Sequence, residues 1–216
     1  MENIIPIDIG CLFAIVVKNG EKDRIVKALQ IKSAEFFSWE IANQRKNETD
    51  KFDENGAFEM VIISDDIVGW NFIICNKIYD FKYSLNCCNL LKGEFEEIYS
   101  FAVDVHSGLY RFMKIHKGEM KRLFERDANH NTGEFGEELP EEKQMKVEND
   151  EHDYFHAVKL TQILLKEKEW IENKELFEKP VLVGKRYFKE IEKYPNLYIE
   201  PLKTKKLNLD DIDLPF

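Results

Sequence analysis

Runs of apolar residues separated by short polar turns predict that this chain folds around an antiparallel sheet. The clearest signal covers about residues 97–126, where three runs are joined by glycine-bearing turns at residues 106–108 and 117–118. Turns this short join antiparallel neighbours, because a parallel crossover needs a dozen or more residues. The segment therefore predicts an antiparallel meander.

Two more segments predict strands of the same sheet. Residues 11–17 are a continuous apolar run followed by an Asn-Gly turn, which is typical of a buried N-terminal strand. Further along, two apolar runs flank the acidic pair Asp65 and Asp66. Because adjacent carboxylates between two such runs favour a turn, we expect a hairpin over about residues 58–75.

Apolar residues at helical spacing predict four helices. In the first, Ile25 and Leu29 share one face. In the second, Ser33 is a favourable N-cap, and the spacing of Phe36, Phe37 and Ile41 predicts that they face a core. The predicted helices cover about residues 21–31, 33–43, 84–93 and 153–173. Together with the antiparallel sheet they give an α+β fold.

The length of 216 residues suits one large domain or one domain with a modest appendage. We place a single α+β domain at residues 1–180 and a C-terminal extension at residues 181–216. The extension carries a lysine-rich run at residues 203–206 and ends in the acidic tail LDDIDLPF.

The formal charge of −10, from 41 acidic and 31 basic residues, narrows the class of partner. Nucleic-acid phosphates and anionic lipids attract clustered Lys and Arg, so we expect neither, whereas a basic protein partner is favoured. The four cysteines form no CxxC pair and three lie in apolar runs, which indicates buried, reduced thiols. No basic leader and no apolar stretch of about 20 residues is present, so we expect a cytoplasmic protein.

Sequence motifs for cofactor binding are absent: the chain has no GxxxxGK[ST], GxGxxG or GxSxG pattern. We therefore expect no cofactor, and the chain reads as a binding protein rather than an enzyme. One alternative is a metal-dependent hydrolase, because His152 and His156 lie four positions apart, as in zinc-binding helices. Asp153 stands where metalloproteases place their general-base Glu, and two polar residues at a helix start are the simpler interpretation.

A second alternative is a sheet that binds single-stranded nucleic acid, since aromatic and basic residues together can stack bases and track a phosphate backbone. The residues concerned lie on the predicted meander and are Tyr99, Phe101, Tyr110, Arg111, Phe112, Lys114, Lys121, Arg122 and Phe124. Ordinary half-buried strands favour the same residue types, and the net negative charge opposes phosphate binding.

Several short segments resemble, in order and spacing, a loosely defined group of uncharacterised bacterial cytoplasmic proteins. They are Gly69-Trp70, the run FEEIYSF at residues 95–101, the hairpin at residues 110–124 and GEELPEE at residues 136–142. The group shows a "GW" strand, a strand like EVQYFA, a hairpin with an Asn-Gly turn and a GEPTPEE-like segment. The resemblance covers about residues 58–142, with Lys117 replacing Asn in the turn and Leu139 replacing Thr. It supplies no catalytic residues, and because some members occur near toxin or mobile-element genes, it implies an immunity-like or regulatory role.

These observations lead to one main hypothesis, a non-enzymatic interaction module that binds a basic protein through an acidic, aromatic-bearing face. The expected contact residues are Asp65, Asp66, Trp70, Tyr110 and Arg111. For Trp70 and Tyr110 the competing interpretation is packing in the core, because aromatic residues of sheets mostly point inward.

Overall fold

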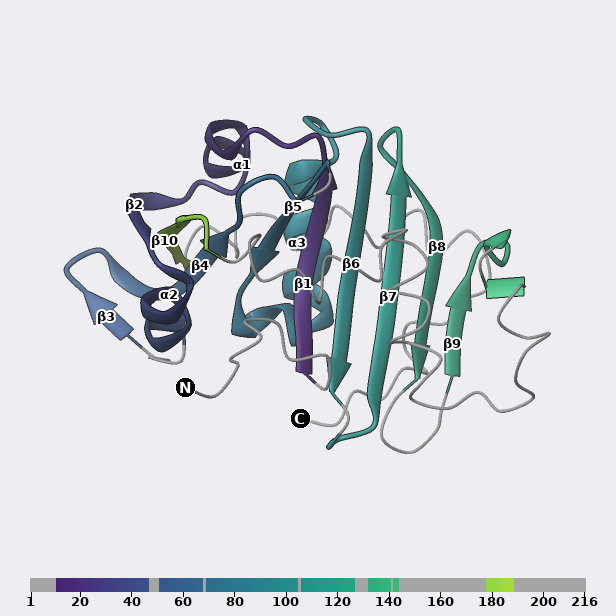
Figure 1. Ribbon diagram of the computed structural model, residues 1–216. Coiled ribbons are helices and arrows are strands. Elements are labelled where there is room, and N and C mark those ends of the chain that lie inside the picture. The colour runs from purple at the N-terminus through teal and green to yellow at the C-terminus, as the bar shows by residue number, and fades with distance from the viewer. Residues whose placement is uncertain are drawn as a thin grey trace.

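The computed structural model describes residues 11–46, 51–67, 69–104, 106–126, 132–140, 142–143 and 178–188. Within these residues ten strands form one open antiparallel sheet in the order β2-β10-β4-β5-β1-β6-β7-β8-β9, and β3 pairs with β4 off this path (Figure 1). The predicted α+β class is therefore confirmed.

The elements have the following bounds. The strands are β1 (Cys11–Lys18), β2 (Lys32–Phe37), β3 (Lys51–Asp53), β4 (Gly56–Ile63), β5 (Trp70–Ile74), β6 (Glu97–Asp104), β7 (Leu109–His116), β8 (Glu119–Arg126), β9 (Thr132–Phe135) and β10 (Val181–Tyr187). The helices are α1 (Lys22–Ala28), α2 (Trp39–Lys46), the 3-10 helix η1 (Asn76–Tyr79) and α3 (Phe81–Leu91).

Strand β1 is the predicted N-terminal strand, and it lies near the middle of the sheet between β5 and β6. Ala14 and Val16 point to one face, while Ile15 and Val17 point to the other, and all four are completely buried. Because both faces are covered at this strand, its sequence is apolar throughout instead of alternating with polar residues.

The two faces of the sheet carry separate apolar clusters. On one face, α1, η1 and α3 pack over the sheet with residues such as Ile25, Ile78 and Leu91, and Figure 1 shows α3 behind the strands. On the other face, Trp39 and Ala42 of α2 cover one part. We call this second face the aromatic face, because it carries the buried rings of β6 and β7.

The helix predicted at residues 33–43 is wrong in its first half. Residues 32–37 form the strand β2, which pairs with β10, and the helix α2 begins only at Trp39. The residue before this helix is Ser38, whose side chain accepts a hydrogen bond from the amide of Ile41 at 3.4 Å, so Ser38 and not the predicted Ser33 is the N-cap. The strand forms because β10, from far along the chain, supplies its hydrogen-bonding partner. Local helical spacing does not reveal such a partner.

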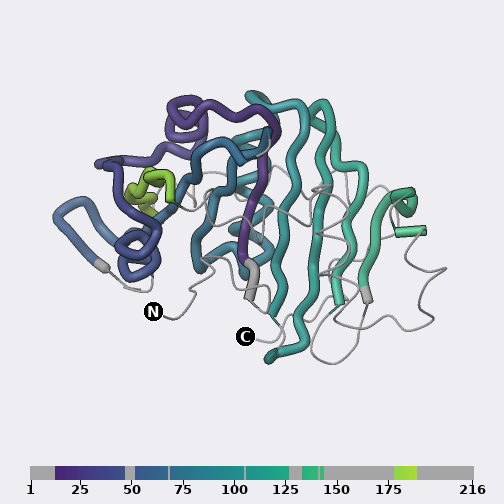
Figure 2. Tube along the Cα trace, viewed as in Figure 1, coloured from purple at the N-terminus to yellow at the C-terminus, as the bar shows by residue number. Residues whose placement is uncertain are grey.

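Strand β10 also changes the predicted domain boundary after residue 180. Its residues 181–187 lie inside the sheet between β2 and β4, although they come from the predicted extension (Figure 2). Gly184 is required where the chain before β2 crosses β10, because a Cβ there would lie 2.3 Å from Ile31 Cγ2. The predicted helix over residues 153–173 and the tail after residue 188 lie outside the described residues.

Candidate protein-binding surface

The five predicted contact residues do not form one surface. Asp65, Asp66 and Trp70 lie at the connection between β4 and β5, whereas Tyr110 and Arg111 lie on β7, three positions from β5 in the sheet. Tyr110 is 5% exposed and Arg111 is 1% exposed. As successive residues of a strand, they point to opposite faces of the sheet. Because both side chains are buried, a partner cannot contact either of them in this conformation. The prediction of an exposed patch that includes them is corrected accordingly.

The connection that carries the other three residues is held by hydrogen bonds. Ile67 and Trp70 exchange two backbone hydrogen bonds of 2.7 and 3.0 Å, and Asp66 Oδ1 accepts the Gly69 amide at 3.0 Å. Gly69 adopts a φ of +84°, which residues with a side chain rarely adopt, and its carbonyl accepts the Asn19 amide at 2.8 Å. The turn after β1 therefore fixes the position of this connection.

Two lysines approach Asp65 from separate segments. The Nζ of Lys22, on α1, lies 3.0 Å from Asp65 Oδ1, and the Nζ of Lys179, before β10, lies 3.8 Å from Oδ2. The same Lys22 Nζ lies 5.0 Å from the ring centroid of Phe36 on β2. Partial burial by itself would raise the pKa of Asp65, but the hydrogen bond and charge of Lys22 outweigh burial and lower it. We define the Asp65 corner as Lys22, Phe36, Asp65 and Asp66.

Trp70 takes part in a similar arrangement of a lysine, an aromatic ring and a carboxylate. Lys18 Nζ lies 5.6 Å from the Trp70 ring centroid and 3.1 Å from Glu97 Oε2. The ring of Trp70 also packs on that of Tyr99, with 5.5 Å between centroids, so only part of the indole reaches the surface. Burial by itself would raise the pKa of Glu97, but the hydrogen bond and charge of Lys18, together with Tyr99 and Lys114, lower it overall.

Phe36 is the residue of this surface that the sequence did not predict, and its side chain is 63% exposed. The predicted helix placed both Phe36 and Phe37 toward a core. On a strand two successive residues point to opposite faces, so Phe37 packs against the aromatic-face cluster and Phe36 is left at the surface. The signal available in the sequence was the pair of adjacent aromatic residues Phe36 and Phe37 directly before Ser38, the N-cap of α2.

Arg111, predicted as a contact residue, serves as a buried internal support. It donates to the carbonyl oxygens of Ile78 and Tyr79 at 2.8 and 2.9 Å and to Glu125 Oε1 at 3.2 Å. Burial lowers the pKa of Arg111, while the charge of Glu125 acts in the opposite direction. The side chain therefore fixes η1 to β7 and β8.

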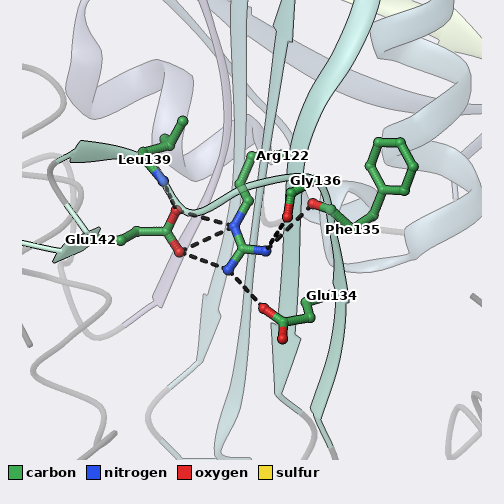
Figure 3. Close-up of polar contacts among 6 residues, drawn as sticks. All are labelled: Arg122, Glu134, Phe135, Gly136, Leu139 and Glu142. Carbon is green, nitrogen blue, oxygen red and sulfur yellow. Dashed lines mark hydrogen bonds and ion pairs between the residues drawn. The ribbon is translucent and has the colours of Figure 1, made fainter.

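Arg122 forms a buried polar network, which Figure 3 shows. Its guanidinium, 1% exposed, donates through Nε and Nη2 to Glu142 at 2.9–3.2 Å and through Nη2 to Glu134 at 3.0 Å. Nη1 donates to the Gly136 carbonyl oxygen at 3.2 Å. Glu142 Oε2 also accepts the Leu139 amide at 2.7 Å, as the third residue of a helical turn does in a capping box. We call these contacts the Arg122 latch.

The Arg122 latch accounts for the GEELPEE segment in structural terms. Gly136 has a φ of +80°, and a Cβ there would lie 2.0 Å from the Lys121 carbonyl oxygen, so only glycine fits. Leu139 is 8% exposed and Glu142 is 3% exposed. The residues of this segment that are buried hold the chain beyond β9 against the sheet.

The aromatic face is closed to nucleic-acid bases in this conformation. Tyr99, Phe101, Tyr110 and Phe112 are all between 0% and 5% exposed, and stacking a base requires an accessible ring. Arg111 and Arg122 of the same prediction are buried in the contacts described above. Six of the nine residues expected to bind single-stranded nucleic acid are therefore part of the core, whereas Lys114 and Phe124 are partly exposed and Lys121 is exposed.

Cys75, Cys87 and Cys88 are free and buried, in agreement with the expected buried, reduced thiols. Burial raises the pKa of Cys87 to about 11 even though Arg186 Nη1 lies 2.9 Å from its sulfur. Burial likewise raises the pKa of Cys75. Thiols with raised pKa values are poor nucleophiles, so these side chains are structural.

No group of three or more His, Cys, Asp or Glu side chains within the described residues is placed to hold a metal ion. His152 and His156 lie outside those residues, so the metal-dependent hydrolase stays a prediction. Among the helices that the structure describes, none is both long enough and apolar enough to cross a membrane. In comparisons with known proteins, no family model, no curated protein and no solved structure matches this chain.

Proposed function

We propose that this protein is a non-enzymatic interaction module that binds a basic protein partner through the Asp65 corner. The observation that carries the proposal is the exposed ring of Phe36, which shares the Lys22 amino group with the carboxylate of Asp65. Asp66, the next residue of the same connection, is exposed as well. Aromatic residues are enriched in protein interfaces and supply much of their binding energy. The immunity-like or regulatory role is part of this proposal, because binding would control the partner's activity.

The rigidity of the Asp65 corner supports this assignment. Its residues come from α1, β2 and the connection before β5, and the hydrogen bonds of Asp66, Ile67 and Gly69 fix that connection before any partner arrives. A surface that is already ordered loses little conformational freedom on binding, which favours affinity.

The charge distribution supports a basic partner. The described residues contain 21 acidic and 21 basic side chains, whereas the whole chain contains 41 and 31, so the net charge of −10 comes entirely from the remaining residues. Charge acts over about 8–10 Å at physiological salt and mainly speeds association. We therefore assign the long-range attraction to the net charge and the short-range contacts to the Asp65 corner.

The proposal is tested by cross-linking followed by binding measurements with purified proteins. A photoreactive amino acid replaces Glu21, an exposed residue next to Lys22, in the source cells, and a second chain carries it at Glu54 in the β3–β4 turn as a control. We expect one basic protein to be captured from position 21 and not from position 54. The purified partner is then titrated against wild-type protein and variants.

The decisive variant is Phe36→Ser with Asp66→Lys, and the matched control is Phe52→Ser with Glu40→Lys. Phe52 is 77% exposed on β3, so both variants remove one exposed aromatic ring and reverse one exposed acidic charge. We expect the first variant to bind at least about tenfold more weakly and the control to bind within about twofold of wild type. Equal losses in both variants, or no saturable binding by the purified partner, would overturn the proposal.

A further inference from the structure

We infer that the Asp65 corner is a binding site for an arginine side chain of the partner, and that the chain's own Lys22 occupies this site in the free protein. The inference rests on the proposed function and names the chemistry of the contact. The Lys22 amino group lies 3.0 Å from Asp65 Oδ1 and 5.0 Å from the Phe36 ring centroid. A carboxylate beside the face of an aromatic ring is an arrangement that binds organic cations.

Lys22 uses this site incompletely. It contacts one oxygen of Asp65, and the other oxygen lies 3.8 Å from Lys179 Nζ, which is beyond hydrogen-bonding distance. The Phe36 ring is still 63% exposed with Lys22 in place. Lys22 therefore uses only part of the binding capacity that the carboxylate and the ring offer to a cationic group.

A guanidinium group fits these two features better than an ammonium group. It is planar, it can donate two parallel hydrogen bonds to one carboxylate, and it stacks on an aromatic ring. It is also less strongly hydrated than the ammonium group of lysine, so its transfer from water costs less. An arginine of the partner is therefore expected to displace Lys22.

The same three kinds of group meet a second time near the end of β1. Lys18 lies 3.1 Å from Glu97 and 5.6 Å from the ring centroid of Trp70, and half of the Lys18 side chain is exposed. Lys18 is the last residue of β1, Lys22 is the first residue of α1, and a short turn joins them. An arginine-containing peptide is therefore a suitable probe, because each position offers a carboxylate and an aromatic ring to a guanidinium group.

The test is a titration with a blocked hexapeptide of alternating arginine and serine, compared with its lysine counterpart. Lys22→Ala removes the internal cation, and Lys27→Ala removes an exposed lysine from the same helix, so both change the net charge equally. We expect Lys22→Ala to bind the arginine peptide about fivefold more tightly than Lys27→Ala, the size of one cation–π contact plus one exposed ion pair. Adding Phe36→Ala or Asp65→Asn to Lys22→Ala is expected to cancel this gain.

Two outcomes would overturn the inference. One is an equal gain for Lys22→Ala and Lys27→Ala, which would reduce the effect to net charge. The other is a gain that survives Phe36→Ala. The peptide assay needs no cellular partner. A gain in peptide affinity that is specific to Lys22→Ala would therefore support the arginine site even if cross-linking captures no protein. Conversely, a captured partner whose binding depends on Phe36 but not on its own arginines would support the proposed function and overturn the arginine site.

Discussion

Replacing Glu142 with alanine removes the central acceptor of the Arg122 latch and has the largest stability effect that we predict. Glu142 accepts from Nε and Nη2 of Arg122 and from the Leu139 amide, with distances of 2.7–3.2 Å, and both charged side chains are at most 3% exposed. Burial by itself lowers the pKa of Arg122, but the hydrogen bonds and charges of Glu142 and Glu134 together outweigh burial and raise it, so the guanidinium stays charged. Glu142→Ala therefore leaves a buried charge with fewer partners.

The magnitude follows from what Arg122 keeps. Removing one partner of a buried ion pair costs about 3–5 kcal/mol, and the lost Leu139 hydrogen bond adds about 1 kcal/mol. Arg122 still reaches Glu134 at 3.0 Å and the Gly136 carbonyl oxygen at 3.2 Å, which places the loss at the lower end of this range. We expect the free energy of unfolding to fall by about 3 kcal/mol.

The assay is urea denaturation followed by tryptophan fluorescence. With a slope of about 2–3 kcal/mol per molar urea for a domain of this size, the midpoint should fall by about 1 M. Glu134→Ala is the control, because its carboxylate contacts the same Arg122 but its side chain is 60% exposed, and an exposed ion pair contributes about 0–1 kcal/mol. A Glu142→Ala midpoint close to that of wild type, or equal losses in both variants, would refute the reasoning.

Three further changes test other parts of the fold. Gly136→Ala should lower the free energy of unfolding by more than about 1 kcal/mol, since it combines a positive φ with a clash against the Lys121 carbonyl oxygen, and a thermal melt unchanged from wild type would contradict this. Burial raises the pKa of Glu59 above its ordinary 4.5, so the neutral carboxyl stabilises the fold at low pH, and this contribution is lost as pH rises from 4.5 through the folded-state pKa. The melting temperature of Glu59→Gln should therefore vary less with pH across that window than the melting temperature of wild type, and parallel curves for the two proteins would contradict this prediction. The hydrogen bond from Lys185 lowers the pKa of Asp53 from 3.8 to about 2, so its contribution is lost as pH falls through that interval, and Asp53→Asn should flatten the acid limb of urea midpoint against pH.

Local patterns predicted the elements whose partners are close in sequence. The buried strand at residues 11–17, the strand-forming runs after residue 97 and the helix around Leu85 and Leu91 all appear in the structure, because periodic burial leaves a direct mark on composition. Helix α3 begins earlier than expected, since Asp80 accepts the Tyr83 amide at 3.0 Å and caps it. Boundaries depend on such single contacts and are harder to predict than the elements themselves.

Elements whose partners are distant were not predicted. Nothing near residues 32–37 indicates that Val181 and Leu182 pair with them, so Phe36 was placed in a helix and its exposure was missed. Arg111 and Arg122 were predicted as candidate binding residues, because the sequence does not show that Glu125 and Glu142 pair with them inside the fold. Of the predicted contact residues, Asp65 and Asp66 keep accessible side chains because they lie in the connection between β4 and β5.

The position of β10 has a consequence for how the sheet is assembled during synthesis. A ribosome releases the chain from the N-terminus, so β2 and β4 emerge long before the strand that separates them. Until residue 187 is free, these two strands face each other across a missing neighbour, and their unpaired edges invite wrong pairings between nascent chains. Folding is therefore expected to finish late and slowly, as is usual when closure depends on contacts between distant parts of a polypeptide.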